Sequence, residues 1–252
     1  MIKKILLPLT LLIASACGSN VTPSQLAGTD DSCAGFARPN DGNLYHCAAY
    51  PMHDIQGNSI GFRSTLFQIS SAFNPAQRQK IARAVDLAMW AVGEHYIHRY
   101  VEKQSNSDFM KCVARKNPIE LVPVGAPAVI RGKDAAFFAE YAMGGITILQ
   151  TFHDQKRVPA RIRVTNQPLP NLAQAAQGKD YSVAGATQNM DIQVNIQLLN
   201  LGTVNGLPLT DQILAGIIFH EWLHRVGFDH VSGQETNTFI RAAGECVGNE
   251  NR

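Results

Sequence analysis

The chain has 252 residues, with 22 Lys and Arg residues against 20 Asp and Glu residues, and a formal net charge of +2. Removing Lys3 and Lys4, which belong to an N-terminal leader, leaves 20 basic against 20 acidic residues. This balance argues against a nucleic-acid-binding protein and against a polybasic membrane patch. Hydrophobic residues form 45% of the chain, which is enough for one sizeable core.

Residues 1–16 are predicted to be a secretion signal. Lys3 and Lys4 precede a short apolar stretch, and Ala14-Ser15-Ala16 follows it. The apolar stretch is shorter than the ~20 residues that a membrane-spanning helix needs. Two processing routes fit these residues. Ala-x-Ala suits ordinary signal peptidase, whereas Cys17 after small residues resembles a bacterial lipoprotein signal.

The lipoprotein interpretation implies a lipid on Cys17, an outer-membrane or cell-surface location, and no other contact with the membrane. Gly18 after the cysteine resembles outer-membrane sorting. Residues 17–32 are small and polar, so we interpret them as the lipidated cysteine and a flexible tether. Without lipidation, the protein is expected to be periplasmic or secreted.

The cysteine count agrees with lipidation. Five cysteines are present, and lipidation of Cys17 leaves an even number for an oxidising compartment. The candidates for two disulfides are Cys33, Cys47, Cys112 and Cys246. Three pairings of these four residues are possible, and the sequence does not choose among them.

The N-terminal part of the remaining chain is expected to hold one strand and one long helix. We interpret residues 33–58 as an irregular section tied by a disulfide, and Ile60 to Ile69 as a strand. Asn74-Pro75 is a typical helix start, and apolar residues then recur at helical spacing to about residue 103.

The middle of the chain is expected to be mainly strands. The predicted strands are 119–131, 145–151, 158–165 and 191–199, with a short helix near 132–142 and a turn at Gly144-Gly145. Ile192 to Gln197 alternates apolar and polar residues, as a half-exposed strand does. That strand is either an ordinary one with a solvated face or an edge that holds an extended substrate.

The most informative stretch is His220-Glu221-Trp222-Leu223-His224-Arg225-Val226-Gly227-Phe228-Asp229-His230. Residues 220 and 224 lie on the same face of a helix, where two imidazoles can bind one zinc ion. Glu221 beside the first ligand can reach a water molecule on that ion. Thr210 is predicted as the N-cap of this helix, with Asp211 at the positive end of its dipole.

Gly227 and His230 extend the pattern beyond a bare H-E-x-x-H. Gly227 can adopt the left-handed conformation that ends a helix, so that the chain turns and brings His230 round as a third ligand. Three protein ligands leave a fourth position for water, which is typical of a catalytic zinc site.

This stretch resembles the signature of the metzincin clan of zinc metallopeptidases. The resemblance implies zinc bound by His220, His224 and His230, with Glu221 as general base. It also implies an α+β domain over residues 33–252, with a twisted mixed sheet, a long backing helix, a zinc-binding active-site helix and a short C-terminal subdomain at about 228–252. Clan members also carry a methionine turn, but all six Met residues here precede the motif.

An alternative arrangement takes a downstream glutamate as the third ligand, as thermolysin-like enzymes do. Glu245 lies near the required spacing, and Glu235 is closer. This alternative leaves Gly227 and His230 without a role. Other histidines are interpreted without metal: His95 and His98 as surface or packing residues, and His46, His53 and His153 as surface residues.

The predicted activity is that of a monomeric zinc metalloendopeptidase acting on peptide or protein substrates. Water activated by one catalytic Zn²⁺ attacks the scissile carbonyl, and Glu221 transfers the proton. An alternative activity that would use the same site is hydrolysis of a small non-peptide amide. A different class of function is a surface lipoprotein that binds a partner and uses zinc only for stability.

Overall fold

The computed structural model describes residues 33–124, 126–131, 134–166, 176–177, 189–204, 206–228 and 238–248. The predicted signal peptide, Cys17 and the tether lie outside these ranges. Within them the chain is a mixed α+β structure, in agreement with the predicted class. Among the described helices, none combines the length and apolarity needed to cross a bilayer.

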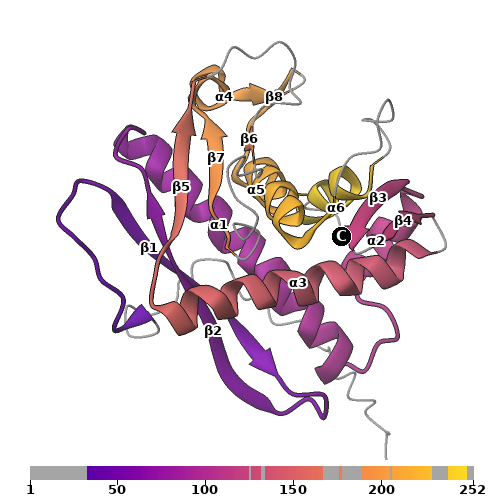
Figure 1. The fold of residues 1–252 in the computed structure, drawn as a ribbon. Coiled ribbons are helices and arrows are strands. Elements are labelled where there is room, and N and C mark those ends of the chain that lie inside the picture. The colour runs from indigo at the N-terminus through magenta and orange to yellow at the C-terminus, as the bar shows by residue number, and fades with distance from the viewer. Residues whose placement is uncertain are drawn as a thin grey trace, which may run out of the picture.

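The elements follow one another as a hairpin, two helices, a second hairpin, a long helix, five strands with a short helix among them, and two C-terminal helices (Figure 1). The strands are β1 Leu44–His53, β2 Ser59–Ile69, β3 Glu120–Val124, β4 Ala126–Ile130, β5 Ala160–Thr165, β6 Ala176–Gln177, β7 Ile192–Asn195, β8 Thr203–Val204 and β9 Leu207–Pro208. The helices are α1 Pro75–Tyr96, α2 Asp108–Arg115, α3 Ala135–Lys156, α4 Ile196–Leu201, α5 Asp211–Val226 and α6 Phe239–Val247.

The main sheet is mixed and has the order β1-β2-β5-β7-β6. β1 and β2 are antiparallel, β2-β5 and β5-β7 are parallel, and β6 runs antiparallel to β7. The predicted strands at 60–69 and 158–165 are confirmed as β2 and β5. β7 is paired on both sides at Gln193 and Val194, so of the two alternatives left open for this strand, a free substrate-binding edge does not apply at these residues.

β7 is also shorter than the predicted strand at 191–199, because α4 begins at Ile196. The side chain of Asn195 accepts a hydrogen bond from the backbone N–H of Gln197 at 2.9 Å. Asparagine competes in this way for local backbone donors, and here it caps a helix instead of continuing the strand.

The expectation of an irregular section over 33–58 is wrong for β1, which pairs along its whole length with β2. The residues of β1 do not alternate in polarity, and Pro51 lies inside the strand. β1 therefore forms because it pairs with β2 in the long hairpin, and not because of its own residue pattern. Tyr50 is fully buried on the helix-covered side, and its hydroxyl donates to Gln150 Oε1 of α3 at 2.7 Å.

The long helix predicted from residue 75 is confirmed as α1, which continues into a π-helical turn at Ile97–Val101. Asn74 and Gln77 form a capping box at its start. Ile81, Val85 and Val92 are fully buried. α1 packs against both β1 and α5, and it thus joins the sheet to the helix that carries the histidine motif.

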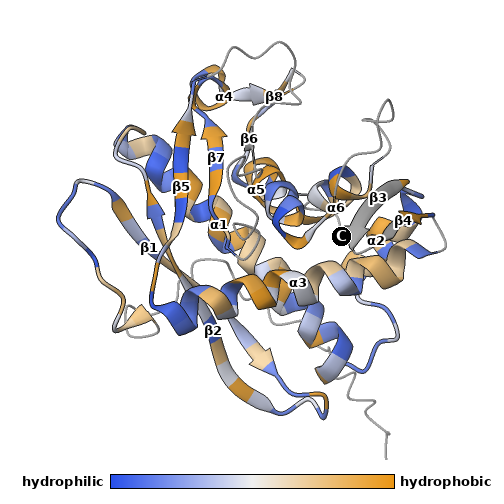
Figure 2. Cartoon of the chain, viewed as in Figure 1, coloured by the Kyte–Doolittle hydropathy of each residue, from blue (hydrophilic) through white to orange (hydrophobic). Residues whose placement is uncertain are grey.

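The helix predicted near 132–142 is the first part of α3, which runs without interruption from Ala135 to Lys156, so the predicted turn at Gly144-Gly145 and the strand at 145–151 are wrong. Its buried residues, including Ile146, Leu149 and His153, recur at helical spacing. Figure 2 shows the apolar centre of this helix, which crosses the molecule beneath α5. The predicted strand at 119–131 is likewise two strands, β3 and β4, which form a hairpin.

The two adjacent glycines of α3 have different surroundings. A methyl group at Gly145 would lie 2.2 Å from Val226 Cγ1 of α5, whereas one at Gly144 meets no atom within 4 Å. We expect Gly145→Ala to lower the free energy of unfolding by about 1–3 kcal/mol through overpacking. Gly144→Ala is expected to raise it by about 0.5–1 kcal/mol, because alanine favours helix.

Urea denaturation of both single variants tests this difference. Adding Val226→Ala to Gly145→Ala supplies the missing space, so the combined change should cost less than the sum of the two single changes. Equal changes in the free energy of unfolding for Gly144→Ala and Gly145→Ala would contradict the close contact between Gly145 and Val226.

The four described cysteines form two disulfides, Cys33–Cys47 and Cys112–Cys246. The first joins the N-terminal section to β1, where Phe36 and Leu66 complete a small apolar cluster. The second joins α2 to α6 across 134 residues of sequence. The structure thus chooses one of the three pairings that the sequence left open.

Candidate metal centre

The histidine motif lies on α5, which begins where the sequence predicted. The Thr210 side chain accepts a hydrogen bond from the backbone N–H of Ile213 at 3.1 Å, and this confirms the N-cap. Asp211 in the first turn accepts hydrogen bonds from Lys80 and Arg83 of α1. Those two contacts fix the start of α5 against α1.

His220, Glu221 and His224 form the one cluster of potential metal ligands found among the described residues. Their ligand atoms all lie within 4.8 Å of one another. The imidazole centroids of the two histidines are 5.3 Å apart, and His220 Nε2 lies 3.8 Å from Glu221 Oε1. Both histidines are partly exposed, whereas Glu221 is 6% exposed. One helical turn therefore presents two imidazoles beside a nearly buried carboxylate.

The turn after α5 fixes the orientation of His224. Gly227 has φ 104°, and its N–H bonds to the carbonyls of Leu223 and His224. The chain reverses there, so that the Phe228 carbonyl oxygen lies 3.0 Å from His224 Nδ1. An Nδ1–H donor leaves Nε2 as the nitrogen with a lone pair for a metal. The left-handed glycine predicted from sequence thus helps to select a tautomer.

The donors of this cluster fit zinc. Imidazole nitrogens are preferred zinc ligands, and the backbone carbonyl that holds His224 is a typical outer partner of a liganding histidine. His220 and His224 would hold the ion. His230 lies outside the described residues, so its role as third ligand stays a prediction.

Glu245, the alternative third ligand, is engaged elsewhere. Its carboxylate accepts hydrogen bonds from Lys116 Nζ at 2.7 Å and Arg241 Nε at 2.9 Å. Burial acts to raise the pKa of Glu245, but these two cations outweigh burial and lower it. Glu245 is absent from the cluster formed by the described ligands. Glu235 lies outside the described residues.

Sequence reasoning missed the residues that connect α5 to the start of β7. Trp222 is fully buried, and its Nε1 donates to the Met190 carbonyl at 3.2 Å. The Arg225 guanidinium donates to the Asp191 carbonyl, at 2.9 Å from Nε and 2.6 Å from Nη2. Both side chains occupy the unspecified positions of the motif. No local pattern identifies such contacts, because their partners lie over 30 residues away.

His153 is also buried, which contradicts the surface role predicted for it. Its Nδ1 bonds to the Val158 carbonyl at 3.0 Å, and its Nε2 accepts from the backbone N–H of Met190 at 2.9 Å. The error follows from the predicted strand at 145–151, because His153 instead lies within α3 on its buried side. His153 thereby helps to hold the segment that contacts Trp222.

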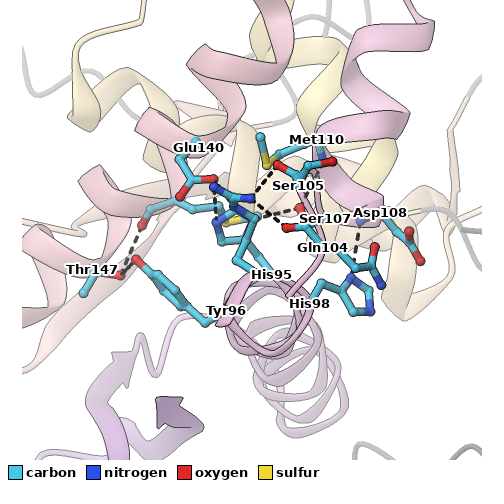
Figure 3. A network of polar contacts seen from close by, with 12 residues as sticks. His95, Tyr96, His98, Gln104, Ser105, Ser107, Asp108, Met110, Glu140 and Thr147 are labelled. Atoms are coloured by element: carbon cyan, nitrogen blue, oxygen red, sulfur yellow. Dashed lines mark hydrogen bonds and ion pairs between the residues drawn. The ribbon is translucent and has the colours of Figure 1, made fainter. Parts of the chain in front are cut away.

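His95 and His98 lie in a separate polar network at the end of α1 (Figure 3). His95 is buried, with Nδ1 2.8 Å from Ser107 Oγ and Nε2 3.7 Å from Glu140 Oε2. His98 Nδ1 accepts from the backbone N–H of Asp108. The packing role considered for these residues fits both, and neither belongs to the cluster of described metal ligands.

The buried His95 makes stability depend on pH. Burial, helped by the positive charges of Arg99 and His98, lowers the pKa of His95 from 6.5 to about 3. The unfolded chain thus binds a proton at this residue more readily than the folded chain does. The free energy of unfolding is therefore unaffected by this group above pH 6.5 and falls as the pH drops toward 3. We expect a loss of about 2 kcal/mol from this group between pH 7.5 and pH 5.

Urea denaturation of metal-free protein at pH 7.5 and pH 5 measures this loss. His95→Asn removes the titrating group and keeps a partner for Ser107. The variant should therefore lose about 2 kcal/mol less than the wild type over that range. The same loss in both proteins would assign the acid sensitivity to other groups.

Comparison with known proteins adds no relative: no family model, curated protein or solved structure matches the chain.

Proposed function

We propose that the protein is a zinc-dependent metallopeptidase of metzincin type, with one catalytic Zn²⁺ held by His220, His224 and His230. The observation that carries this proposal is the cluster on α5, where the ligand atoms of His220, Glu221 and His224 lie within 4.8 Å of one another. The carbonyl that orients His224 supports it further, because liganding histidines usually have such a partner.

The burial of Glu221 supports its role as general base. The Glu221 carboxylate is 6% exposed and lies on the turn that carries both imidazoles, so it would be close to a water molecule on an ion held there. A bound zinc ion supplies Lewis acidity and lowers the pKa of water toward about 7. Glu221 would accept the proton of the attacking water and return it to the leaving amine nitrogen.

Export to an oxidising compartment is part of the proposal. The two disulfides, Cys33–Cys47 and Cys112–Cys246, support it because such bonds persist mainly outside the cytoplasm. Lipidation of Cys17 would anchor the mature chain. Mass spectrometry of the mature N-terminus tests this point, and an unmodified Cys17 would leave a simply secreted or periplasmic protein.

The test of activity is cleavage of a diverse peptide mixture, read by mass spectrometry. We expect cuts that disappear after treatment with a chelator and return when zinc is added. The residues flanking the cuts would define specificity. If the protein binds zinc and makes no cuts, while the chelator lowers only its thermal stability, zinc is structural and the peptidase proposal fails.

A further inference from the structure

α6 contacts the metal-binding face of α5 through backbone atoms. A methyl group at Gly216 would lie 2.4 Å from the Gly244 backbone carbonyl oxygen, and one at Gly248 would lie 2.8 Å from the Gln212 backbone carbonyl oxygen. A methyl group at Gly244 would lie 3.3 Å from His220 Cβ. Residues 212, 216 and 220 form one row along α5, since they are four residues apart. The row that ends at His220 therefore rests directly on α6.

α6 also reaches the second histidine of the cluster. Phe239, its first residue, stacks on Phe228 with ring centroids 4.6 Å apart and an interplanar angle of 16°. Both rings are buried. The Phe228 carbonyl oxygen is the partner of His224 Nδ1. One short helix thus supports His220 through Gly244 and His224 through Phe239 and Phe228.

The opposite side of α6 is fixed to α2. The Cys112–Cys246 disulfide joins the two helices, and Lys116, just after α2, forms an ion pair with Glu245 at 2.7 Å. Cys246 and Glu245 are the two residues that follow Gly244. Any displacement of this part of α6 therefore moves the backbone against which His220 rests.

We infer that α6 is the positioning element of the metal centre, and that the Cys112–Cys246 disulfide is needed for full metal affinity. In this view the site reaches its final affinity only after the chain is oxidised. Cys112 and Cys246 are positioning residues, since they act through Gly244 and Phe239. The inference rests on the proposed zinc binding and is independent of whether peptides are cleaved.

The chain contains a matched control, because its other described disulfide lies away from the cluster. Full-length wild type, Cys112→Ser/Cys246→Ser and Cys33→Ser/Cys47→Ser would be titrated with zinc against a chromogenic chelator, below the unfolding temperatures of all three. We expect 10- to 100-fold weaker zinc binding in the first variant, by analogy with the loss of outer partners of metal ligands. The second variant should bind as the wild type does.

The absorption spectrum of bound Co²⁺ gives a readout that stability alone does not move. The Cys112→Ser/Cys246→Ser protein should show an altered spectrum, and the control an unaltered one. Equal zinc affinity and equal spectra in the two disulfide variants would overturn the inference.

A milder pair of substitutions covers the case in which the disulfide variant does not fold. Phe239→Leu removes the stacking on Phe228, whereas Phe73→Leu changes a buried ring before α1. We expect about 10-fold weaker zinc binding from the first and no change from the second. Equal binding would overturn the inference. Zinc binding without peptide cleavage in the wild type would instead refute the proposed activity and leave the inference standing.

Discussion

Glu221→Gln is expected to lower the rate of peptide cleavage by about 10²–10⁴-fold and to leave zinc binding intact. The factor is the usual contribution of a general acid–base group. Glutamine preserves the size of the side chain and removes the carboxylate that is proposed to accept the proton.

Cleavage rates and bound zinc would be measured together for this variant and for the matched control Glu102→Gln. Glu102 follows the π-helical turn and is exposed, so its loss should change neither quantity. A Glu221→Gln protein that cleaves peptides at the wild-type rate would refute the assignment of the base. Loss of zinc from that variant would indicate a ligand role instead.

His220→Ala and His224→Ala are each expected to weaken zinc binding by roughly 100-fold or more. Zinc sites of four ligands bind with about 10–16 kcal/mol, or about 3 kcal/mol for each ligand. That loss corresponds to roughly two orders of magnitude in the dissociation constant. Peptide cleavage should fall with the zinc content, because in the proposed mechanism the two histidines hold the ion that activates water.

The measurement is the zinc remaining after dialysis against a weak chelator, with His46→Gln as the control. His46 pairs with Asp86 across β1 and α1, so its removal tests the general effect of losing a histidine. Retention of zinc by both alanine variants would place the ion elsewhere. His230→Ala in the same assay tests the third ligand.

Local signals in the sequence were sufficient for some elements. Thr210 as N-cap and Gly227 as C-cap delimit α5, because capping groups act within one turn of their own residue. Asn74-Pro75 similarly begins α1. The spacing of His220 and His224 places them on one helical face wherever that helix lies in the fold.

Other elements depended on distant partners, and sequence patterns misjudged them. Gly144-Gly145 has the local signal of a turn, yet burial of Ile146 and Leu149 and the contact of Gly145 with Val226 make it helical. β1 has no alternating pattern and becomes a strand because β2 offers its backbone groups along ten residue pairs. In both cases tertiary packing outweighs local preference.

The sequence by itself determined which groups meet at the candidate site, since two imidazoles and a carboxylate at this spacing share one helical turn. Only the tertiary structure decided how that turn is held. Gly244 against His220, the Phe228 carbonyl on His224, and the disulfide that fixes α6 to α2 all join residues from separate elements. The physical reason is the distance along the sequence over which each interaction acts. Helical spacing and caps act over a few residues, whereas ligand orientation depends on backbone surfaces that meet only when the chain is folded.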